Sequence, residues 1–95
     1  MSLSVNLTVP PTLRSQSNYT VQFSVLRPAD GNEIFVDNHL TSSTLSNGTD
    51  DSQKTATVSR SSLPRFSDGG DIELRAHFWK GDKLVESQKC GLLSL

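Results

Sequence analysis

Hydrophobic and polar residues alternate along most of this chain, with a period of two rather than the 3.6 of an α-helix. The segments SVNLTVP (4–10) and YTVQFSVL (19–26) show the alternation most clearly. Successive side chains of a strand point to opposite faces, so each segment predicts a β-strand with one buried face. Pro10 and Pro28 end these strands, because proline removes a backbone donor from the ladder.

Four further segments indicate strands, and one of them, residues 33–40, alternates less clearly than the rest. They are EIFVDNHL (33–40), KTATVSR (54–60), DIELRAHFWK (71–80) and KLVESQKCGLLSL (83–95). A short seventh strand near Thr44 and Leu45 is an open alternative. No window keeps helical spacing for more than about two turns, and no internal repeat is found.

The Gly-Asp pair at 81–82 predicts a β-hairpin with a two-residue turn. This turn would place Trp79 opposite Leu84 and Phe78 opposite Val85. Phe78 then lies in the core and Trp79 on the other face of the sheet.

Continued along the hairpin, that register would place Lys89 opposite Leu74 in the core. We therefore expect a β-bulge or a change of register between residues 87 and 91. A three-residue turn would avoid this conflict but would put Glu86 opposite Ala76, so both turns remain open.

Six or seven strands separated by clusters of Pro, Gly, Asn, Asp and Ser predict an all-β fold, an antiparallel β-sandwich formed as a single domain by residues 1–95. The number of strands resembles that of immunoglobulin and fibronectin type III domains, and this resemblance covers most of the chain. The paired cysteines and the core tryptophan of true immunoglobulin domains are missing. A small β-barrel is the alternative architecture.

Composition narrows the classes of partner. The net charge is −1, from 9 basic and 10 acidic residues, whereas a nucleic-acid or anionic-membrane binder normally carries a basic excess. No segment approaches the ~20 apolar residues of a membrane span. We therefore expect neither nucleic acid nor a membrane as partner, and no cofactor.

The compartment is left open. The single cysteine, Cys90, excludes an intrachain disulfide and slightly favours the cytoplasm. The first residues lack the charged and apolar regions of a signal peptide. The sequons that begin at Asn6, Asn18 and Asn47 instead favour a secreted protein whose leader has been removed.

Enzymatic activity is not expected. The two histidines, His39 and His77, lie on different predicted strands, and no GxSxG elbow or phosphate-binding loop is present. His77 is expected to be an exposed strand residue beside Glu86. Cys90 could serve as a nucleophile with His77, but a half-buried, inert thiol is the favoured interpretation.

A calcium site is a weak hypothesis. An immunoglobulin-like strand order would bring the loops PADGNE (28–33), NGTDDSQ (47–53) and KGDK (80–83) to one end of the sandwich. Their oxygen ligands would then gather there: Asp30, Asn32, Glu33, Asp50, Asp51 and Asp82. Ordinary turn chemistry explains the same residues and is favoured, so no metal site is expected.

The leading hypothesis for function is a non-enzymatic binding module that recognises or inhibits another protein through loops at one end of the sandwich. The expected contact residues are Trp79, Lys80 and Asp82 at the hairpin tip, with His77 beside them. A structural or assembly subunit that forms a homo-oligomer, such as a homodimer, through sheet faces or edges is an alternative. Carbohydrate binding is another alternative, although one Trp and one Tyr offer little surface for a sugar.

Overall fold

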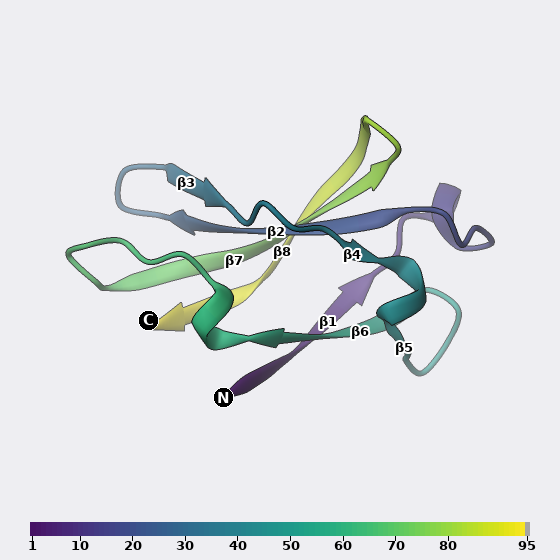
Figure 1. Cartoon of the computed structure of the whole chain (residues 1–95), viewed down its shortest axis with the longest axis horizontal. Helices are drawn as coiled ribbons and strands as arrows, with labels where there is room; N and C mark the ends of the chain where they lie inside the picture. Colours follow the sequence, from purple (N-terminus) through teal and green to yellow (C-terminus); the bar gives the residue numbers. More distant parts are fainter. Residues whose placement is uncertain (95) are drawn as a thin grey trace.

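The chain folds into two antiparallel β-sheets that pack face to face (Figure 1). The structure is a computed structural model and describes residues 1–94. The three-stranded sheet has the order β1-β6-β5, and the five-stranded sheet has the order β3-β2-β7-β8, with β4 also paired to β2. The all-β, antiparallel prediction is therefore confirmed.

Eight strands and three short 3₁₀ turns make up the described chain. The strands are β1 (Ser2–Thr8), β2 (Thr20–Arg27), β3 (Asn32–Phe35), β4 (Leu40–Thr41), β5 (Ser46–Asn47), β6 (Gln53–Ser59), β7 (Asp71–Lys80) and β8 (Lys83–Ser94). The 3₁₀ turns are η1 (Pro11–Leu13), η2 (Ser42–Thr44) and η3 (Arg60–Ser62). No helix in the described chain has the length and apolar character needed to cross a membrane.

Two predicted strands differ from the structure. The segment 33–40 is not continuous, because both β3 and β4 pair with β2 and the chain leaves the sheet between them. The short seventh strand lies at Ser46–Asn47, directly after the predicted position, since Thr44 closes η2. Both differences occur where the alternation is weakest.

The alternating apolar residues of both sheets form one core between the layers. Its largest fully buried side chains include Phe78, Leu7 and Leu13. The other buried hydrophobic residues are Val5, Val9, Tyr19, Val21, Phe23, Val25, Leu45, Ala56, Val58, Leu63, Ile72, Leu74 and Ala76. Burial of alternate positions is the reason that these segments are strands.

The hairpin β7–β8 confirms part of the predicted register and corrects the rest. Trp79 lies opposite Leu84 as predicted, but Phe78 lies opposite Glu86 rather than Val85. Val85 is therefore the extra residue of a first β-bulge. A second bulge falls in the predicted interval, since Leu74 pairs with Gly91 and Arg75 with Lys89, leaving Cys90 unpaired.

The loops form two groups, at opposite ends of the molecule (Figure 1). At the first end, Arg27 on the β2–β3 turn bonds to Asp68 of the β6–β7 connection. At the second end, the segment 9–19 lies near the β5–β6 loop, with Arg14 and Asp51 lining one cavity. The β7–β8 turn also belongs to the second end, because Lys80 donates to Asn18.

Candidate functional site

The strongest candidate surface is the side of the five-stranded sheet that faces away from the core, called here the outer face. Strand alternation places polar side chains there, from four adjacent strands. A few apolar side chains lie among them, and the residues of this face include Glu33 and Phe35 of β3, Gln22 and Ser24 of β2, Glu73, Arg75, His77 and Trp79 of β7, and Leu84, Ser87, Lys89 and Leu92 of β8.

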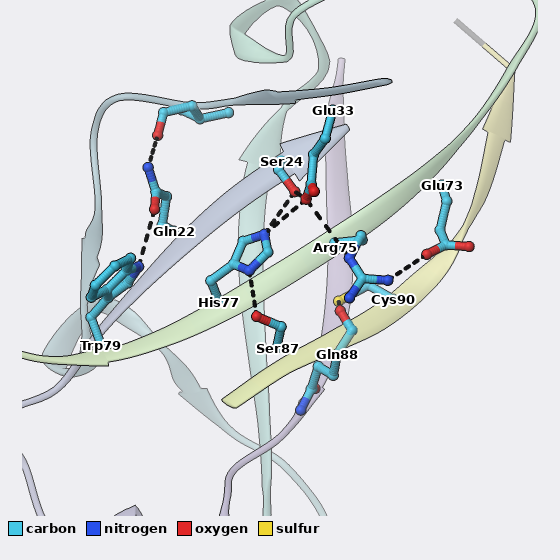
Figure 2. Close-up of polar contacts among 11 residues, drawn as sticks. Gln22, Ser24, Glu33, Glu73, Arg75, His77, Trp79, Ser87, Gln88 and Cys90 are labelled. Carbon is cyan, nitrogen blue, oxygen red and sulfur yellow. Dashed lines mark hydrogen bonds and ion pairs between the residues drawn. The ribbon is translucent and has the colours of Figure 1, made fainter. Parts of the chain in front are cut away.

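His77 lies at the centre of this face and is buried, with only 5% of its surface exposed. Its Nε2 atom is 2.8 Å from Ser24 Oγ and 3.2 Å from Glu33 Oε2. Its Nδ1 atom is 2.6 Å from Ser87 Oγ. Figure 2 shows these side chains converging on the imidazole from three strands. The Phe35 ring covers it, with centroids 4.9 Å apart.

The hydrogen bonds define one tautomer of His77. Ser24 Oγ donates to Glu33 Oε2 at 2.5 Å, so it must accept from His77 Nε2–H. His77 Nδ1 then accepts from the Ser87 hydroxyl. Burial lowers the pKa of His77, nearby Arg75 lowers it further, and Glu33 partly opposes this shift. The imidazole is thus held in its neutral form.

Charged residues continue the cluster along β7 towards its start. Arg75 lies 3.8 Å from Glu33 and donates to Glu73 at 2.8 Å. Lys89 Nζ is 3.9 Å from Glu73. These ion pairs connect three strands, and Figure 2 shows Arg75 between the two carboxylates. They fix the direction of side chains that would otherwise be mobile.

Ser87, His77 and Glu33 follow one another in the order of a serine hydrolase triad. A nucleophilic serine also needs N–H donors aimed at the developing oxyanion. The backbone N–H groups beside Ser87 are those of strand β8 and lie in the plane of the sheet, not above it. The hydrogen bonds of the cluster fix the orientation of these side chains on the face.

The expected position of His77 on an exposed surface is wrong. The prediction placed it on the correct face but assumed that this face is open to solvent. The β3 residues Phe35 and Glu33 lie over it, and its partner on β8 is Ser87 rather than Glu86. His77 therefore offers very little of its own surface to a partner.

Trp79 lies on the same face and is half-buried. Its Nε1 donates to Gln22 Oε1 at 3.0 Å, and the Gln22 amide donates to the Val36 carbonyl at 2.9 Å. The His39 ring lies 5.9 Å away. Two successive hydrogen bonds thus anchor the indole, and Figure 2 shows them beside the His77 cluster. Part of the indole surface remains exposed.

The other two expected contact residues lie at the hairpin tip. Lys80 is half-buried and donates to Asn18 at 3.2 Å. Asp82 is exposed in the turn. The structure therefore places Trp79, Lys80 and Asp82 close together in the chain but divides them between the sheet face and the turn.

The weak calcium hypothesis assumed a grouping of loops that is wrong. Asp30, Asn32 and Glu33 lie on the β2–β3 side, at or near the first end, whereas Asp50, Asp51 and Asp82 lie at the second end. The prediction took the first strand as the first strand of an immunoglobulin sandwich, but β1 pairs with β6 and the next connection crosses to the other sheet. The β2–β3 turn therefore lies at the opposite end of the molecule from the β5–β6 and β7–β8 loops.

The individual carboxylates already have partners within their turns. Arg27 hydrogen-bonds to Asp30 and lowers the pKa of that carboxyl. The Ser52 hydroxyl and backbone N–H do the same for Asp50. Within residues 1–94, no three His, Cys, Asp or Glu side chains are grouped in a way that could hold a metal ion.

Cys90 occupies the second bulge of β8 and is half-buried. Burial raises the pKa of its thiol to about 11. The thiolate required of a nucleophile is therefore scarce at neutral pH. The sulfur lies near the Gln88 carbonyl, at 4.0 Å, rather than near His77 (Figure 2).

Three exposed hydrophobic side chains lie on the outer face around the polar cluster. Phe35 is 45% exposed, Leu84 46% and Leu92 62%. They come from the two outer strands of the sheet, β3 and β8, on either side of the buried row of β7. Sequence reasoning missed this set, although alternation alone places Leu84 and Trp79 on the same face.

Comparisons with known proteins add no relative. No protein-family model matches the chain, and no curated protein or solved structure is significantly similar to it.

Proposed function

We propose that this chain is a non-enzymatic domain that binds another protein through the outer face of the five-stranded sheet. The observation that carries this proposal is the exposure of Phe35, Leu84 and Leu92 on one face of an otherwise polar sheet. Large apolar side chains rimmed by polar groups are typical of contact surfaces.

The cluster beneath these residues supports the same proposal. Two serines and Glu33 hold His77 in one orientation, and ion pairs hold Arg75 and Glu73. A surface that is already ordered loses little side-chain entropy when a partner binds. Trp79 adds a rigid, half-exposed aromatic ring of the kind that dominates many interfaces.

The strand order supports an immunoglobulin-like architecture for this module. The orders β1-β6-β5 and β3-β2-β7-β8 correspond to strands B-E-D and C′-C-F-G of that sandwich. In this interpretation no strand stands in the position of strand A within residues 1–94. The proposed contact surface is then the C′-C-F-G face rather than the loops at one end.

Matched variants test the location of the surface. The protein would first be immobilised and exposed to an extract of the cells from which it comes. A protein that the immobilised chain retains would be purified, and its binding would be measured by titration calorimetry. Phe35→Ser and Leu84→Ser should weaken binding at least about tenfold, a loss of ~1.4 kcal/mol each. Ile34→Ser is the control, because Ile34 is also exposed but lies on the opposite side of β3.

Two results would contradict the proposal. If Lys80→Ala and Asp82→Ala abolish binding while the two face variants bind normally, the loops at the second end are the contact surface. If a fluorophosphonate probe labels Ser87 of the folded protein, the Ser87–His77–Glu33 cluster is reactive and the domain is an enzyme.

A further inference from the structure

The second surface of interest is the free edge of β1, on the opposite side from its ladder with β6. Odd-numbered residues of β1 bond to β6, as the bonds from Arg60 N to the Met1 carbonyl and from Val9 N to the Ser52 carbonyl show at its two ends. In an antiparallel ladder the intervening residues direct their N–H and C=O groups to the other side. Ser2, Ser4, Asn6 and Thr8 therefore present these groups along the free edge.

One residue of this edge already has a partner that imitates a strand. The Thr8 N–H donates to Gln88 Oε1 at 2.9 Å, and Gln88 Nε2 donates to the Thr8 carbonyl at 2.8 Å. The side-chain amide thus makes the same pair of bonds as one residue of a neighbouring antiparallel strand. The edge accepts an amide in β-ladder geometry, and the next residues, Asn6 and Ser4, offer the same pair of groups.

The space beside Ser4 and Asn6 is a cleft rather than a packed seam. It has a volume of 170 Å³ and lies between β1 and β8, which are the adjacent outer strands of the two sheets. Its apolar lining includes the partly buried side chains Leu3, Cys90 and Leu93. Within residues 1–94, no strand pairs with this edge of β1.

The sequence of β1 lacks the usual protection of an edge strand. Ser2–Thr8 contains no charged residue and no proline. Natural edge strands that avoid pairing normally carry one or the other. Since the strand is neutral, two copies brought together at this edge do not repel one another.

We infer that β1 pairs with β1 of a second copy of this chain, antiparallel, with Ser4 on the twofold axis. Ser4 then faces Ser4 of the partner subunit, and Ser2 faces Asn6 of the partner subunit, each pair exchanging its N–H and C=O groups. This register uses the outward groups of Ser2, Ser4 and Asn6 and leaves the Thr8–Gln88 bonds intact. The two three-stranded sheets become one continuous sheet, and the apolar cleft is covered.

The inference is independent of the proposed binding face, because β1 belongs to the other sheet. Sedimentation velocity over a hundredfold range of concentration should show a monomer–dimer equilibrium. Ser4→Lys should raise the dimer dissociation constant at least about tenfold, because two lysines would be cross-strand neighbours. Thr57→Lys is the matched control, since Thr57 lies opposite Ser4 on β6, on the same sheet face but away from the edge.

A second measurement separates edge pairing from other forms of dimer. Amide hydrogen exchange by NMR should protect Ser4 and Asn6 at high concentration only, while the Val5 amide, which bonds to β6, is protected at all concentrations. A protein that stays monomeric throughout overturns the inference. So does a dimer that Phe35→Ser and Leu84→Ser abolish while Ser4→Lys leaves it unchanged, since that dimer would use the outer face.

Discussion

At the residue scale, His77 shows how much a strand pattern can establish. Alternation along β7 correctly separates Phe78 in the core from His77 and Trp79 on the outer face. It does not predict what lies above that face. The burial of His77 depends on Phe35 and Glu33 of β3, which reach it only because β2, the hairpin partner of β3, pairs with β7 from a distant part of the sequence.

The buried His77 predicts a pH-dependent stability. Because its pKa is lowered in the folded state, the unfolded chain takes up the proton first as the pH falls below about 6.5. The stabilisation from neutral His77 is therefore complete above that pH and is lost as the pH falls through the lowered native value. Urea titrations of the wild-type protein at about pH 7.5 and 5.5 should show lower stability at the acid value.

The variant His77→Gln should reduce this difference, because it removes the titrating group, although the variant is less stable at both pH values. His39→Gln is the control, since His39 is exposed and its variant should keep the wild-type difference. If the loss of stability between the two pH values is the same for wild type and His77→Gln, other groups cause the effect.

At the element scale, the hairpin β7–β8 depends on two bulges, of which the sequence indicated one. Lys89 could not enter the core, and this conflict predicted the bulge that the structure places at Cys90. The bulge at Val85 has no such signal, because alternation favours apolar Val85 opposite Phe78, whereas the structure places Glu86 there. The position of this bulge depends on packing against other strands, and the pattern of residues within the hairpin carries no information about that packing.

Gly91 beside the second bulge gives the element-scale prediction. Its φ is 145°, which L-residues with a side chain rarely adopt, although a Cβ there would meet no atom within 4 Å. Gly91→Ala should therefore cost about 1 to 2 kcal/mol through backbone strain alone. Denaturant unfolding measures this loss.

Lys89→Ala is the comparison for Gly91→Ala, because Lys89 is exposed on the same strand with an ordinary backbone. It should change stability by less than about 0.5 kcal/mol. A Gly91→Ala protein as stable as the wild type would show that the bulge changes shape at little cost.

At the scale of the whole molecule, the fold class could be predicted and the arrangement of loops could not. Five of the eight described strands, β1, β2, β6, β7 and β8, are visible as alternating segments in the sequence. The order of strands within the sheets is set by pairings such as β1 with β6, between segments distant in sequence. The prediction did not anticipate the pairing of β1 with β6. It therefore grouped Asp30 with acidic residues that lie at the opposite end of the molecule.

The separation of the acidic side chains predicts that calcium does not stabilise the protein. Asp30 is bonded to Arg27 at the first end, and Asp50 to Ser52 at the second. Thermal unfolding with millimolar calcium chloride should match unfolding with magnesium chloride. A calcium-specific gain of more than about 2 kcal/mol, the effect of a ligand near a hundredfold over its dissociation constant, would show a site that these turns do not explain.

The hydrogen bonds between Thr8 and Gln88 join residues that are 80 positions apart, and this separation constrains how the chain folds during synthesis. Within residues 1–94, β1 is synthesised before the other strands, whereas its ladder partner β6 begins only at Gln53 and Gln88 arrives with β8. Long-range closure of this kind is slow, on the order of milliseconds to seconds in comparable β proteins. The nascent chain therefore carries a neutral strand with both edges open until β6 is made, and the hydrogen bonds between Thr8 and Gln88 form only after β8 is made.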